Sequence, residues 1–155
     1  MRNLRSLDVI CCDAQQRSSV CIFANESVVV RQMPLDLIDR LCIRCGSTRK
    51  GRQEAFRALT GAVQKIPVLI SEDGPLLMPT LSPESGSCVW IAYDSVLRMK
   101  PEGDDMTNVL FLDGTSFKVN VNIRVLRSQA KRCELFRRLL NEFKEHPEDC
   151  LSGNL

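Results

Sequence analysis

The sequence is poor in the residues that build metal and nucleophilic centres, because its 155 residues include a single histidine, His146. A structural zinc site needs four cysteine or histidine ligands, and the chain has one C-x-x-C pair, Cys42 and Cys45. A cysteine nucleophile needs a base, and His146 stands near the end of the chain. We therefore expect no metal, no cofactor and no catalytic activity. A four-thiolate site of Cys11, Cys12, Cys42 and Cys45 remains open as an alternative.

Long apolar segments are also missing. No run approaches the roughly 18 residues that span a bilayer, and the first residues lack the apolar stretch of a signal peptide. We therefore expect a cytoplasmic protein with no membrane partner, whose eight cysteines are reduced thiols. No internal repeat divides the chain, and 44% hydrophobic residues supply an ordinary core for one domain.

Charge is strongly segregated along the chain, although the net charge is only +2. Residues 40–65 hold seven basic and one acidic side chain, and residues 124–144 hold seven basic and two acidic ones. Between them, residues 66–123 hold three basic and eight acidic side chains. Two basic segments favour a surface directed at phosphate. Solvated helix faces are the alternative that charge alone leaves open.

The hydrophobic pattern predicts an α+β fold, a single domain with a mostly antiparallel sheet and two or three helices. Helices are expected at residues 34–41, at 49–59 and, with Ser128 as N-cap, at 128–144. The last of these is amphipathic. Its basic residues lie away from its apolar stripe, so it packs on the sheet, joins subunits or presents Arg132, Arg137 and Arg138 to phosphate.

Strands are expected wherever β-forming residues are bounded by turn residues. Asp113-Gly114 between two such runs predicts a hairpin with a type I′ turn. Residues 1–14 are expected to be loose or weakly paired, and residues 147–155 to form a disordered tail. The expected strands cover residues 19–24, 27–33, 66–70, 76–78, 88–93, 107–112 and 116–121.

Two strings in the middle of the chain carry the most specific signal. The first, from Ile38 to Ser47, reads I-D-R-L-C-I-R-C-G-S and continues to Gly51-Arg52. The second, from Met78, reads M-P-T-L-S and is followed by C-V-W-I from Cys88. Their order and spacing resemble the competence transcription factor family, ComK. The matching positions are Asp39, Arg40, Cys42, Gly46, Ser47, Gly51, Arg52, Pro79, Thr80, Leu81, Ser82, Cys88, Trp90 and Ile91.

This resemblance implies a bacterial regulator with one DNA-binding domain over residues 1–146, which activates DNA-uptake genes. It implies binding to A/T-rich double-stranded DNA, largely through the minor groove, by a homo-oligomer associated with the nucleoid. RNA polymerase and an adaptor–protease system are further implied partners. Past Pro147 the chain is shorter than the best-known members, whose C-terminal region serves multimerisation, activation and proteolytic turnover. This shortness puts full activation and regulated proteolysis in question.

The first string and the segment after it supply the predicted DNA contacts. Arginine suits a narrow A/T-rich minor groove, and basic and hydroxyl side chains bind phosphates. Asp39 and Arg40 are interpreted as an internal ion pair, and residues 79–82 as a strand-ending turn whose hydroxyls satisfy backbone groups. Cys88 and Trp90 are expected in the core, with base stacking by Trp90 as the alternative. The predicted DNA contacts are Arg44, Ser47, Arg49, Lys50, Arg52 and Arg57.

The leading hypothesis is therefore a ComK-like transcriptional activator that binds DNA without a catalytic step. The alternative is a ComK-like protein-interaction or inhibitory regulator that has lost productive DNA binding. A steep dependence of DNA affinity on salt separates the two. A thiol enzyme or zinc protein is a third hypothesis, which metal analysis tests.

Overall fold

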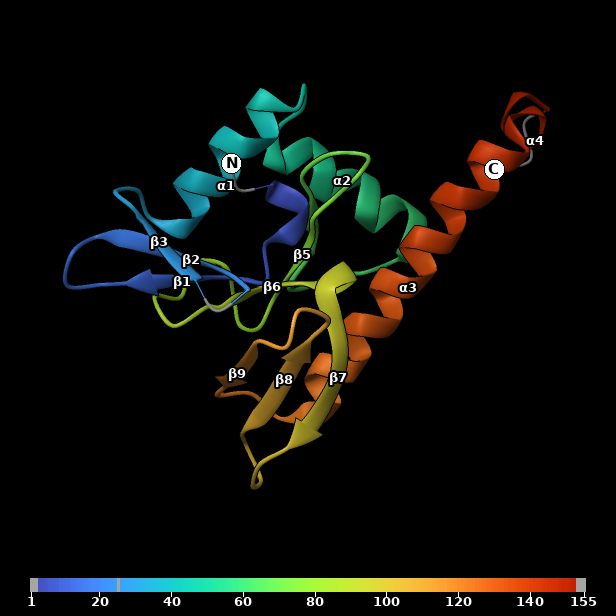
Figure 1. Ribbon diagram of the computed structural model, residues 1–155. Helices are drawn as coiled ribbons and strands as arrows, with labels where there is room; N and C mark the ends of the chain where they lie inside the picture. Colours follow the sequence, from blue (N-terminus) through green and yellow to red (C-terminus); the bar gives the residue numbers. More distant parts are fainter. Residues whose placement is uncertain (1–2, 25, 153–155) are drawn as a thin grey trace.

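Two antiparallel sheets and four α-helices make up the computed structural model, which describes residues 3–24 and 26–152 (Figure 1). The larger sheet has the strand order β3 (Glu26–Val30), β2 (Ser18–Phe23), β1 (Val9–Asp13), β6 (Trp90–Ala92), β5 (Leu76–Pro79) and β4 (Val68–Leu69). The smaller sheet has the order β7 (Val96–Pro101), β8 (Thr107–Phe111) and β9 (Ser116–Val119). The helices are α1 (Pro34–Arg44), α2 (Arg49–Thr60), α3 (Ile123–Glu145) and α4 (Pro147–Leu151), with 3₁₀ turns η1 (Leu4–Ser6) and η2 (Tyr93–Ser95). The predicted α+β class is confirmed.

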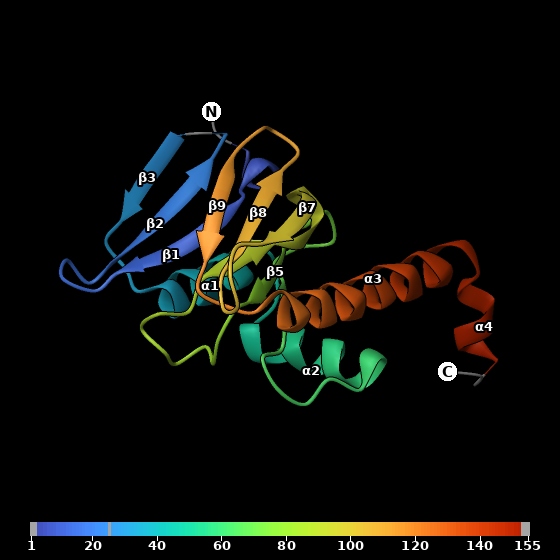
Figure 2. The ribbon, with the colours of Figure 1, turned by 90° about the horizontal axis from the view of Figure 1, so that it is seen from below.

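The larger sheet lies between two layers. One face carries a buried cluster that includes Ile10 and Trp90 and is covered by Leu37 and Ile38 of α1. The opposite face packs against α2, α3 and the smaller sheet, through a cluster that joins Phe56, Phe136 and their neighbours (Figures 1 and 2). α2 and α3, which hold most of the two basic segments, lie side by side, and α2 also contacts the edge strand β4.

The expectation of a loose N-terminal segment is wrong. β1 is a central strand, in which Ile10 pairs with Cys21 of β2 on one side and with Trp90 of β6 on the other. Val9 and Ile10 are fully buried as a result. The second partner comes from a distant part of the chain, so the local sequence pattern carries no sign of it.

Capping residues explain the bounds of α1 and α2. Pro34 occupies the first turn of α1, where its missing N–H costs nothing. Thr48 caps α2 by accepting a hydrogen bond from the backbone N–H of Gly51 at 2.9 Å. Gly61 ends α2 in the left-handed region, with φ of 75°. Both predicted helices are confirmed, α1 running three residues further than expected.

α3 begins five residues before the predicted start. Its N-cap is Asn122, whose side chain accepts a hydrogen bond from the N–H of Arg124 at 2.8 Å, so Ser128 lies inside the helix. α3 ends before Pro147 as expected. Pro147 then begins α4, so the predicted disorder does not extend over residues 147–151, and residues 153–155 lie outside the described residues. Within residues 3–24 and 26–152, no helix is both long and apolar enough to cross a membrane.

The hairpin at Asp113-Gly114 is confirmed as β8–β9, with Val109 opposite Phe117. Its turn is not type I′, because Gly114 has a φ of 91° while Asp113 is not among the residues with positive φ. The alternating burial expected for residues 116–121 is observed. β7 was not predicted. The other expected hairpin, β2–β3, is present, and Asn25 of its predicted turn lies outside the described residues.

Candidate nucleic-acid interface

An ion pair between α1 and α2 holds the first family string in place. The Nε of Arg49 donates to Oδ1 of Asp39 at 2.6 Å. The predicted pair of Asp39 with Arg40 is therefore wrong, because the cation that reaches Asp39 comes from the neighbouring helix. Among the described residues, Arg40 forms no ion pair.

The six predicted DNA contacts fall into two groups. Arg44, Lys50 and Arg57 are exposed and form no ion pair within the described part of the chain, and Ser47 is half-buried. Arg49 is engaged by Asp39. Arg52 is half-buried, and it lines a cavity with residues of α3; its buried Nε has no hydrogen-bond partner in residues 3–24 and 26–152. The structure thus leaves three of the five predicted cations facing solvent.

The second family string has a structural role at the end of β5. The hydroxyl of Thr80 is buried and accepts a hydrogen bond from the N–H of Val89 at 2.9 Å, and the N–H of Thr80 donates to the carbonyl of Val89 at 2.9 Å. Cys88 and Trp90 are buried in the core. These observations agree with the strand-ending turn and the core tryptophan expected from the sequence.

A larger surplus of positive charge lies on the first half of α3. From Ile123 to Cys133 the helix holds four basic side chains and no acidic one. Arg124, Arg127 and Lys131 are exposed, and Arg132 is half-buried. The four residues and Lys65, described below, are named the α3 basic patch: Lys65, Arg124, Arg127, Lys131 and Arg132.

Lys65 joins this patch because the loop after α2 is fixed on α3. The side-chain amide of Gln129, which is buried, donates from Nε2 to the carbonyl of Lys65 at 2.8 Å and to that of Pro79 at 3.0 Å. Lys65, Arg124 and Arg132 then line one open groove of about 470 Å³ between the loop and the helix. Lys65, from the basic segment 40–65, therefore extends the positive surface formed by the basic segment 124–144.

The second half of α3 is different, because two of its three basic side chains pair with acidic residues from η2 and from the turn between β4 and β5. The third, Arg138, is exposed and forms no ion pair among the described residues. Arg137 donates from Nε and Nη2 to the two carboxylate oxygens of Asp94, at 2.9 and 2.6 Å. Lys144 pairs with Glu72 at 2.7 Å. Free positive charge is thus concentrated toward the N-terminal half of the helix.

The sequence allowed Arg132, Arg137 and Arg138 to meet phosphate as one of three roles for this helix, although no site residue was predicted on it. Arg132 lies in the α3 basic patch, Arg137 is bound by Asp94, and Arg138 is exposed. The sequence does not show which of these cations have internal partners.

The seven cysteines whose side chains the structure describes are free thiols, and four of them are buried in the two core clusters: Cys21, Cys42, Cys88 and Cys133. Burial raises the pKa of Cys42 to about 11, with a smaller opposing effect of Arg52, and burial likewise raises that of Cys21 to about 11. Such thiols are protonated at neutral pH and are weak nucleophiles. Cys42 is buried whereas Cys45 is exposed, and no cluster of three or more potential metal ligands occurs in the residues that the structure describes.

Comparison with known proteins gives two matches. Residues 8–145 match the profile of the ComK protein family. The chain is 27% identical over 127 residues to a competence transcription factor of Bacillus subtilis (strain 168), an alignment that covers 81% of this chain and 64% of that protein. No solved structure matches. Because the family match runs from the start of β1 to the last residue of α3, and so includes both sheets and all the basic helices, the chain belongs to the ComK family.

Proposed function

We propose that the protein is a transcriptional regulator that binds double-stranded DNA and catalyses no reaction. The α3 basic patch carries this proposal. It holds five basic side chains with no ion pair among the described residues, and four of them are on a helix half that has no acidic residue. Phosphate is the natural partner for such a surface, since each neutralised phosphate releases condensed counterions.

The name of the Bacillus subtilis relative suggests the regulated genes. It is a competence transcription factor, so we propose that this protein acts on competence promoters. Three of the five patch residues are arginines, the side chain that gains most from a narrow A/T-rich minor groove. We propose that the patch binds A/T-rich DNA with Arg44, Ser47, Lys50 and Arg57 as a second set of contacts. We further propose that the protein is cytoplasmic and homo-oligomeric, and that it works with RNA polymerase and an adaptor–protease system.

One observation favours the alternative of a regulator without productive DNA binding. Arg49 is tied to Asp39, and Arg52 is half-buried against α3, so two residues predicted to contact DNA have internal positions. If DNA binding depended on those two arginines, this chain would have to rearrange before it bound. The α3 basic patch supplies phosphate-binding cations without Arg49 and Arg52, and DNA binding is therefore the first proposal.

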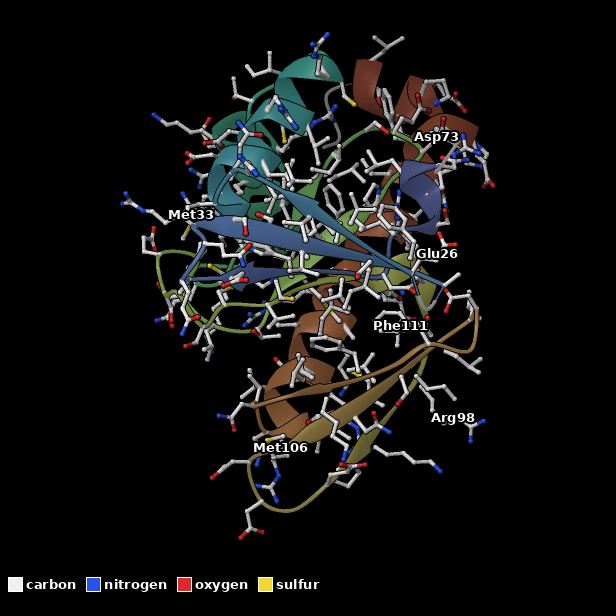
Figure 3. All side chains as sticks on the ribbon, turned by 60° about the vertical axis from the view of Figure 1, so that its left-hand side comes forward. Glu26, Met33, Asp73, Arg98, Met106 and Phe111 are labelled. Atoms are coloured by element: carbon white, nitrogen blue, oxygen red, sulfur yellow. The ribbon has the colours of Figure 1, made fainter. Side chains whose placement is uncertain are left out.

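The test compares two charge-matched variants. Arg127→Gln/Lys131→Gln removes one arginine and one lysine from the patch, and Arg98→Gln/Lys100→Gln removes the same pair from β7, where both are exposed. Arg98 projects away from the smaller sheet in Figure 3. Each lost phosphate contact lowers affinity by roughly tenfold at 0.1 M salt, so the patch variant should lose about ten- to sixty-fold in fluorescence-anisotropy titrations with an A/T-rich duplex. Equal losses in the two variants would refute the assignment.

A further inference from the structure

Among the residues that the structure describes, no strand pairs with the outer edge of β3. β3 is the last strand of the larger sheet and pairs only with β2. Within residues 3–24 and 26–152, Figure 2 shows no helix or strand beyond it, and Figure 3 views the molecule from this side, with the strand running between the labelled Glu26 and Met33. An edge strand presents unpaired backbone N–H and C=O groups at alternate residues. Its last three residues are valines, and Val29 is 57% exposed, so no charged side chain or proline guards this part of the edge.

An apolar groove runs beside the same strand. Val28 and Val30, two residues apart and so on one face of β3, form one wall, and Leu37 and Leu41 of α1 form the other. Phe23 of β2 also lines the groove, which has a volume of about 250 Å³. A strand added to β3 would place every second side chain over this groove, because side chains alternate between the two faces of a sheet.

One charged residue, Arg40, lines this groove. No acidic side chain among the described residues lies within ion-pair distance of Arg40. Asp39 is bound to Arg49, and Asp36, one turn earlier on α1, forms no ion pair with it. The groove therefore offers apolar surface and a single unneutralised cation, which together select for an apolar ligand that bears a carboxylate.

We propose that this edge and groove bind an extended peptide segment of another protein, with apolar residues at alternate positions and one acidic residue that meets Arg40. Backbone hydrogen bonds to β3 supply affinity, while the groove and Arg40 supply specificity. A second copy of the chain fits less well. Two-fold pairing of β3 with β3 would join the two grooves without filling them, because Val28 and Val30 already form the wall in each copy.

A random nonapeptide library displayed on phage, selected on the full-length protein, tests this proposal. The expected sequences alternate apolar residues and share an aspartate or glutamate. Peptides selected on Arg40→Gln should no longer share an acidic residue but should still alternate apolar residues. Peptides selected on Arg40→Lys should again share the acidic residue. Arg31→Gln, which changes an exposed arginine just after β3, should leave the selected sequences unchanged. A recovered peptide should bind Arg40→Gln about tenfold more weakly than the wild type.

The binding position is then read from backbone amide chemical shifts of the protein in NMR spectra. The proposal predicts shifts confined to β3 and α1, with A/T-rich DNA still bound, because the α3 basic patch lies elsewhere. Absence of enriched peptides, or shifts outside β3 and α1, would overturn it. Concentration-dependent dimerisation that shifts the β3 amides without peptide would also overturn it, in favour of a second copy as the occupant.

Discussion

Single side chains from different elements make the contacts that order this fold. Asp39 and Arg49 stand ten residues apart, yet they join α1 to α2 at 2.6 Å. Asp8 is 1% exposed, and its carboxylate lies close to that of Asp113 in the β8–β9 turn. Both cases depend on partners that the local sequence does not indicate, so each gives a prediction at the residue scale.

A double-mutant cycle tests the Asp39–Arg49 pair. Asp39→Asn and Arg49→Ala, singly and together, should reveal a coupling of about 0.5–1 kcal/mol in the free energy of unfolding, since the pair is partly exposed. Urea denaturation of the four proteins measures it. The same cycle with Arg40→Ala in place of Arg49→Ala is the control and should show no coupling. A larger coupling energy of Asp39 with Arg40 than with Arg49 would instead support the Asp39–Arg40 pair predicted from the sequence.

The pH dependence of stability tests the Asp8 site. Burial first, and then the hydrogen bond with and charge of Asp113, raise the pKa of Asp8 from 3.8 to about 7. The folded state therefore holds a proton that the unfolded chain loses near pH 4. Stability should fall as pH rises between those values, by at most about 1.4 kcal/mol per pH unit, and the loss should be complete above pH 7.

Asp8→Asn provides the comparison, because asparagine is neutral at every pH of the experiment. Urea unfolding at pH 5, 6, 7 and 8 should show a flatter profile for this variant than for the wild type. Identical pH profiles for the two proteins would contradict the raised pKa of Asp8.

At the scale of elements, α3 combines two surfaces. Its inner side packs Leu126, Cys133 and Phe136 into the core, with the Phe136 ring 4.7 Å from that of Phe56 on α2. Its outer side carries the basic patch. The register of both surfaces depends on where the helix starts, and that point is fixed by Asn122, which also donates from Nδ2 to the carbonyl of Asp104 at 2.7 Å.

Removing the cap should therefore destabilise the protein. Asn122→Ala is expected to lower the free energy of unfolding by about 1 kcal/mol. Ser128→Ala should change it by less than about 0.5 kcal/mol, because Ser128 is an exposed residue inside the helix. Chemical denaturation of both variants measures the difference. A larger effect of Ser128→Ala would favour the helix start predicted from the sequence.

Some of the helices and strands could be predicted from the sequence, and others could not. α1, α2 and the β8–β9 hairpin were predictable because Pro34, Gly61 and Gly114 act locally, on their own turns. β1 was not predictable, because its burial comes from pairing with β6. β7 has a partly exposed pattern, with Arg98 and Lys100 on the surface, and no hydrophobic run to mark it.

At the scale of the whole molecule, folding sorts the charges that the sequence separates. The two basic segments come together on α2 and α3, while Asp94 and Glu72 pair with Arg137 and Lys144 in the second half of α3. The sequence predicted basic helices and a phosphate-directed surface. It could not predict which cations stay free, because that depends on acidic partners more than forty residues away in the chain.

The most direct test of the account measures DNA affinity against salt concentration for the wild-type protein. If all five cations of the α3 basic patch contact phosphate, a plot of log K against log salt should have a slope of about −4 to −5. The A/T-rich duplex should bind more tightly than a G/C-rich duplex of equal length at every salt concentration. Absence of binding at low salt, or an affinity independent of salt, would contradict the account and leave the protein-interaction regulator as the better explanation.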